Sequence, residues 1–228
     1  MTPFTIRTSL ATAAFIACST VAALAQNGPS PLLDSVRVRQ LVASEAPADQ
    51  ALLAAHFTAL AERHASAARL HESMGRSAAG NPRGNGQEMK VHCQRLAGLE
   101  RKASTTLREL AAHHNALSGG VASVAPVSGA RYQTGAEARQ PTETDMNALV
   151  GRAVTPADHR VLQDYFQTFA TQYEAEADGH VGMATLYRTT SRLAPVANHC
   201  DRLVTELRAA AAEARQAATM HGAMAEQK

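Results

Sequence analysis

The chain has 228 residues, of which 45% are hydrophobic, 18% charged and 4% aromatic, and its formal net charge is +2. The apolar fraction is too high for a disordered chain, and the small net charge gives no reason to expect a nucleic-acid partner. Alanine is prominent among the apolar residues, which favours closely packed helices over β-sandwiches.

Residues 1–25 have the pattern of a signal peptide. Arg7 precedes an uncharged apolar stretch that ends in Ala23-Leu24-Ala25, and small residues at both alanine positions suit signal peptidase. We therefore expect cleavage before Gln26 and export to the periplasm or out of the cell. A lipoprotein acylated at Cys18 is the lesser alternative. No later segment is apolar enough to span a bilayer, so we expect no integral membrane segment after cleavage.

The rest of the chain contains an internal repeat. Residues 47–74 and 156–183 share nine identical positions of 28, and residues 90–117 and 197–224 share ten. Shared alanines raise such counts, but they do not explain the paired His, Met and Cys residues. The sequence therefore predicts a duplication.

Each copy has the pattern of a helical hairpin, over residues 47–118 and 156–228. Apolar residues recur every three or four positions, which places them on one helix face. Short apolar pieces in residues 26–46 and in the Gly/Ser/Ala-rich linker 119–155 predict two short helices. We expect an all-α four-helix bundle built from two duplicated hairpins, which pack on each other or on a second molecule as a homodimer.

Histidine, methionine and cysteine residues occupy matching places in the two copies. A hairpin turn should bring the end of its first helix beside the start of its second, so each copy should gather two imidazoles, a thioether and a thiol. The predicted sets are His71, Met74, His92 and Cys93 in the first copy, and His180, Met183, His199 and Cys200 in the second.

These sets suggest a metal site. Soft sulfur ligands with imidazole suit Cu(I) best, so copper is the favoured cofactor. The alternative is a disulfide between Cys93 and Cys200, the default for a cysteine pair in an exported chain. That disulfide requires both hairpin turns to lie at the same end of the bundle, with the hairpins parallel.

His114 and His221 lie about 33 Å along the helix from the predicted sets, at 1.5 Å per residue. We therefore expect structural roles for them at the open ends of the hairpins. There His114 should lie near Asp49 and His221 near Asp158. A histidine at a helix C-terminus also interacts favourably with the helix dipole.

His-x-x-Met, followed by His-Cys-x-Arg-Leu and a late His, resembles a group of bacterial exported, Ala-rich helical-hairpin proteins. The likeness covers residues 47–117 and 156–224, with a departure at Leu117, where the second copy has Met224. The resemblance implies export and a helical fold, and it implies no activity.

The sequence thus predicts an exported protein that binds or buffers a soft metal ion. The alternative is a structural or envelope-interaction protein whose cysteine pair is a disulfide staple. An enzyme is not expected, because the chain lacks a nucleophile elbow, a haem-attachment motif and a zinc-protease helix.

Overall fold

The computed structural model describes residues 32–81, 86–121, 142–190 and 193–227, and within them the all-helical prediction is confirmed, with no strand. The predicted signal peptide and most of the predicted linker, residues 122–141, lie outside the described residues. The helices are α1 (Ser35–Val42), α2 (Pro47–Ala79), α3 (Gly86–Leu117), α4 (Glu143–Arg152), α5 (Pro156–Thr189) and α6 (Ala197–Glu226), with a 3-10 turn at Ala194–Val196 before α6.

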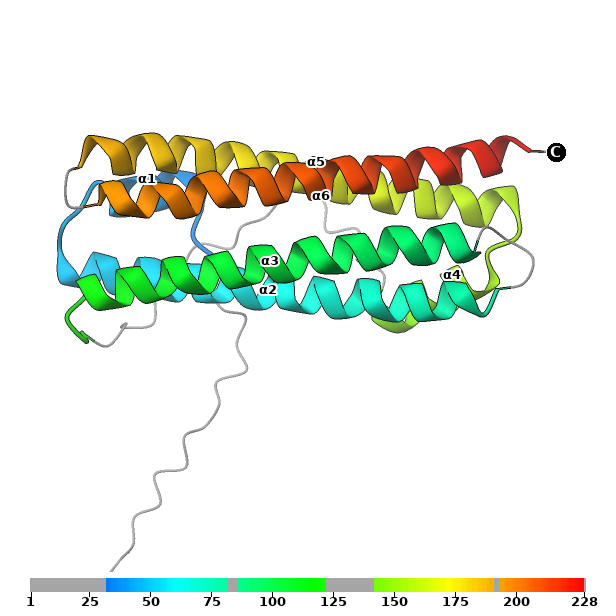
Figure 1. The fold of residues 1–228 in the computed structure, drawn as a ribbon, viewed down its shortest axis with the longest axis horizontal. Helices are drawn as coiled ribbons and strands as arrows, with labels where there is room; N and C mark the ends of the chain where they lie inside the picture. Colours follow the sequence, from blue (N-terminus) through cyan, green and yellow to red (C-terminus); the bar gives the residue numbers. More distant parts are fainter. Residues whose placement is uncertain (1–31, 82–85, 122–141, 191–192, 228) are drawn as a thin grey trace, which may run out of the picture.

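Four long helices form a bundle (Figure 1). Helices α2 and α3 form one antiparallel pair, α5 and α6 form a second, and α3 packs directly against α6. The short helix α1 contacts α2 and α5, whereas α4 packs against α2. Among the described helices, none is both long and apolar enough to cross a bilayer.

The sequence marks where several helices begin. Thr155 caps α5, because its side chain accepts a hydrogen bond from the backbone of Asp158 and the Asp158 carboxylate accepts one from the backbone of Thr155. Pro156 follows at the first helical position, where a missing N–H costs nothing. Thr142 and Asp145 form the same reciprocal cap at the start of α4.

The turns of the two pairs lie at opposite ends of the bundle. His114, near the end of α3, is hydrogen-bonded to Tyr187, near the end of α5. His221, near the end of α6, contacts Met89, near the start of α3. The two pairs are therefore antiparallel to each other, and the parallel arrangement that a disulfide would require is wrong.

The predicted disulfide is wrong for the same reason. Cys93 and Cys200 are free thiols, and both are buried. His92 pairs with Glu213 across α3 and α6, and thirteen residues of α6 separate Cys200 from Glu213. At 1.5 Å per residue, the two cysteines lie about 20 Å apart along the bundle, well beyond the reach of a disulfide.

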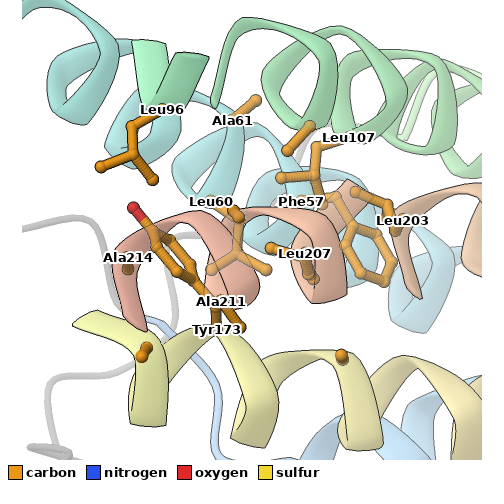
Figure 2. Close-up of a cluster of buried hydrophobic side chains, with 14 of the residues drawn as sticks. Phe57, Leu60, Ala61, Leu96, Leu107, Tyr173, Leu203, Leu207, Ala211 and Ala214 are labelled. Atoms are coloured by element: carbon orange, nitrogen blue, oxygen red, sulfur yellow. The ribbon is translucent and has the colours of Figure 1, made fainter. Parts of the chain in front are cut away.

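Leucine and alanine fill the close contact between α3 and α6, whereas larger side chains fill the space between α2 and α5. Figure 2 shows Phe57 and Leu107 beside Leu203 from α6, with Tyr173 reaching in from α5. Small residues of α6, such as Ala211 and Ala214, are buried in the same core (Figure 2). The wider α2–α5 side has room for polar and aromatic groups.

Candidate functional site

The first predicted set is buried, but its two imidazoles face different partners. His71 packs against Phe166 and Phe169 of α5, at ring-centroid distances of 6.5 and 5.6 Å. The Nδ1 atom of His92 lies 2.6 Å from a carboxylate oxygen of Glu213 on α6. Cys93 and Met74 are fully enclosed, and the Cβ of Cys93 faces the space that Gly75 leaves open.

The second set is divided in a similar way. His180 is buried, with its ring centroid 6.4 Å from that of Phe57 on α2. His199 is half-buried on the α3 side, where its Nδ1 lies 3.4 Å from a carboxylate oxygen of Glu109. Met183 and Cys200 are buried in the core. Burial raises the pKa of both Cys93 and Cys200 to about 12, so these thiols are poor nucleophiles at neutral pH.

His71 is unusual because neither of its ring nitrogens has a hydrogen-bond partner. Its side chain is fully enclosed, and burial lowers its pKa to about 4, so the imidazole is neutral at pH 7. Within the described residues, no three His, Cys, Asp or Glu side chains gather as they would around a metal ion.

His114 closes the end of the bundle where α2 begins. Its Nδ1 lies 2.7 Å from the amide oxygen of Gln50, and its Nε2 lies 2.7 Å from the hydroxyl of Tyr187. His114 lies at the predicted end of the bundle, but its partner is Gln50 and not Asp49. The Asp49 carboxylate instead accepts a hydrogen bond from Ser44. Both nitrogens are satisfied, and burial lowers the pKa of His114 to about 3.

At the opposite end, His221 meets a different set of groups. Its Nδ1 lies 3.1 Å from Nδ1 of His159, and its Nε2 lies 3.3 Å from the sulfur of Met89. A cavity of about 20 Å³ adjoins these side chains, and Met224 also lines it. We call His159, His221, Met89 and Met224 the end cluster.

His159 was not among the residues selected from the sequence, because the predicted first copy has no histidine at the matching position. The repeat offset of 109 residues places Gln50 there, and Gln50 is the partner of His114. A comparison of each copy's predicted histidine contacts, rather than of histidine positions alone, would have identified it. His221 was predicted to lie near Asp158, and in the structure it contacts the next residue, His159.

A second polar group lies in the middle of the bundle, between α2, α3 and α5. His64 bridges Glu100 and Glu176, with its Nε2 3.0 Å from Glu176. Glu100 also accepts the hydroxyl hydrogen of Tyr173, and Glu176 pairs with Arg63 nearer the surface. We call these five residues the core network; His64 and Glu176 were visible in the sequence as polar residues on apolar helix faces.

The core network holds its charges in place. Burial alone would lower the pKa of His64, but the charge of Glu176 and hydrogen bonds with Glu100 and Glu176 raise it to about 9. Burial alone would raise the pKa of Glu176, but His64 and Arg63 lower it to about 2. Two cations therefore balance two carboxylates, and both His64 nitrogens are occupied, so none is free to bind a ligand.

Comparisons with protein-family models, with curated proteins and with solved structures find no match to this chain. Inferences about its function therefore depend on its own residues.

Proposed function

We propose that this protein is an exported, non-catalytic helical bundle that binds a soft metal ion, with copper(I) favoured. The observation that carries the proposal is the contact of 3.3 Å between Nε2 of His221 and the sulfur of Met89, both buried. Imidazole nitrogen and thioether sulfur, which the end cluster gathers beside one cavity, suit a soft monovalent cation better than Zn²⁺ or Mg²⁺. The signal-peptide pattern of residues 1–25 supports a periplasmic or secreted location.

Metal binding through the two predicted sets remains a second form of the same proposal. His71 could bind a ligand because both its nitrogens are free. The set as a whole has less support, because His92 is directed towards Glu213 and His71 towards Phe166.

We also propose that the two antiparallel pairs arose by duplication. Phe57 and Phe166 occupy matching positions, and each packs against one histidine of its own pair's last helix and one of the other pair's first helix. Phe57 contacts His114 of its own pair and His180 of the other, at centroid distances of 5.4 and 6.4 Å. Phe166 contacts His221 and His71 in the same way, at 5.9 and 6.5 Å. This reciprocal pattern supports a common ancestor for the two halves.

Copper(I) binding is tested by anaerobic titration of the purified chain against a Cu(I)-specific chelator of known affinity. We expect the protein to withdraw one equivalent of Cu(I) from the chelator, and to bind Zn²⁺ far more weakly. Retention of all the copper by the chelator, even when the chelator is at the concentration of the protein, would contradict the proposal.

A structural or envelope-interaction role is the second candidate, without the disulfide that the sequence suggested. It is favoured by the many neutral imidazoles in the core, which serve as packing groups and make the fold sensitive to acid. The buried histidines whose pKa burial lowers are His56, His71, His114, His159, His180 and His221. A protein that binds no copper yet loses its structure reversibly in mild acid would favour this role.

A further inference from the structure

The end cluster brings nitrogen and sulfur donors from three helices to one place. His159 comes from α5, His221 and Met224 from α6, and Met89 from α3. The rings of His159 and His221 are stacked, with centroids 5.3 Å apart and an interplanar angle of 22°. His159, His221 and Met89 are buried, and Met224 is half-buried beside the cavity.

The contact with Met89 determines which nitrogen of His221 is available. Sulfur is a weak hydrogen-bond acceptor, so the Nε2–H group of His221 can donate to it. A neutral imidazole carries one proton, so Nδ1 of His221 is then an unprotonated donor atom facing Nδ1 of His159. Met89 thus orients a metal-binding imidazole from outside the ligand set, as hydrogen-bonding partners do in known metal sites.

We propose that Nδ1 of His159, Nδ1 of His221 and the sulfur of Met224 bind one Cu(I) ion, and this inference rests on the proposed function. Two metal–imidazole bonds of about 2 Å require the nitrogens to be roughly 4 Å apart. They are 3.1 Å apart in the structure, where Nδ1 of His159 donates a hydrogen bond to Nδ1 of His221. The adjacent cavity of about 20 Å³ gives the rings room to separate.

Binding of the ion changes neither the oxidation state of copper nor the number of protons on the two imidazoles. His159 moves its single proton from Nδ1 to Nε2 through solvent, so both imidazoles stay neutral and the ion replaces a hydrogen bond.

The opposite end of the bundle provides a natural control. At the positions equivalent to His159, His221 and Met224, the first copy has Gln50, His114 and Leu117. There Gln50 and Tyr187 satisfy both nitrogens of His114, and no thioether is present at the position of Met224. Of these two sets of matching positions, the one where α5 begins has two imidazoles and a thioether.

The test replaces the end cluster with the residues of the control end. We would measure Cu(I) affinity by chelator competition for the full chain and for the His159→Gln, Met224→Leu and His114→Gln variants. The side-chain amide of Gln at position 159 can still donate a hydrogen bond to Nδ1 of His221, and Met224 is half-buried, so both variants should fold, as circular dichroism would verify. We expect His159→Gln to weaken Cu(I) binding at least 100-fold, Met224→Leu about 10-fold or more, and His114→Gln not at all.

X-ray absorption at the copper edge gives an independent result. We expect two nitrogen scatterers and one sulfur scatterer in the wild-type complex, with the sulfur lost in Met224→Leu. If the chain binds Cu(I) but the end-cluster variants bind it as tightly as the wild type, the location is wrong while the proposed function stands. If the wild-type chain binds no Cu(I), both are wrong.

Discussion

Buried histidines in this bundle differ in what surrounds their nitrogens. Both ring nitrogens of His71 lack a hydrogen-bond partner. His92 pairs with one carboxylate, and His64 pairs with two carboxylates. The same residue type can therefore destabilise the fold at one position and stabilise it at another, because an unsatisfied buried polar group costs free energy.

Replacing His71 with leucine should leave the fold unharmed. Leucine removes two unbonded polar atoms from the core and has a similar volume, so we expect the free energy of unfolding at pH 7 to stay the same or rise by about 1 kcal/mol. Urea denaturation measures this value. The matched control is His92→Leu, which removes the buried partner of Glu213, leaves it the more distant and exposed Arg95, and should cost about 1–3 kcal/mol. A loss in His71→Leu as large as in the control would contradict the prediction.

Glu100 holds the core network together. Its replacement by leucine leaves the hydroxyl of Tyr173 and a charged His64 without their shared partner. Removing one partner of a buried ion pair costs about 3–5 kcal/mol. We expect the free energy of unfolding, measured by urea denaturation, to fall by that amount. Glu62→Ala, which breaks an exposed pair with Arg108, should change the stability by less than about 1 kcal/mol. Equal effects of the two substitutions would show that the core network contributes little.

At the scale of the helix, Gly86 permits the close approach between the end of α2 and the start of α3. A Cβ at this position would overlap the carbonyl oxygen of Ala78 and lie 3.0 Å from that of Asn81. Gly86→Ala should therefore destabilise the protein by about 1–3 kcal/mol in thermal or urea unfolding. A Cβ on Gly98, inside α3, would meet no atom of a neighbouring residue within 4 Å, so Gly98→Ala should stabilise the helix by about 0.5–1 kcal/mol. A stabilising Gly86→Ala would refute this account.

Helices could be predicted from the sequence, but the relative direction of the two pairs could not. The apolar period and the Thr155-Pro156 start define the helices locally. The direction depends on contacts between residues far apart in the chain, such as Met89 with His221, which no local pattern encodes. The expected disulfide failed because it assumed that direction.

The candidate site was predictable only in its chemistry. The sequence correctly indicated imidazole and sulfur in the core, since His71, Cys93 and Met74 are all buried. Which of these groups meet depends on the facing helix. Gly75 allows Cys93 to pack against α2, and the end cluster joins α3, α5 and α6, so no spacing within one copy could reveal it.

At the scale of the whole molecule, the buried histidines should give stability a maximum at about pH 7, where the five with lowered pKa values and His64 balance. Five of them have folded-state pKa values of about 3 or 4, against 6.5 when unfolded, so the unfolded chain binds more protons as the pH falls below 6.5. Stability should then fall by on the order of 1.4 kcal/mol per histidine per pH unit. These residues are His56, His71, His114, His180 and His221.

His64 acts in the opposite direction. Its folded-state pKa of about 9 means that the folded chain keeps a proton that the unfolded chain releases, so its contribution to stability should fall as the pH rises from 6.5 towards 9. Urea denaturation from pH 5 to pH 9 measures both branches, and the acid branch should be shallower in His71→Leu. A flat profile below pH 6.5 would show that these histidines are not neutral in the fold.

The antiparallel arrangement also sets a minimum length for the segment that joins α3 to α4. His114 is level with Gln50, whereas Asn147 of α4 is level with Ser73, and twenty-three residues of α2 separate those levels. The chain between α3 and α4 must therefore cover about 35 Å, which needs at least ten extended residues. Deletions that leave fewer should prevent one chain from closing its own bundle, so that two copies exchange halves and form a domain-swapped dimer.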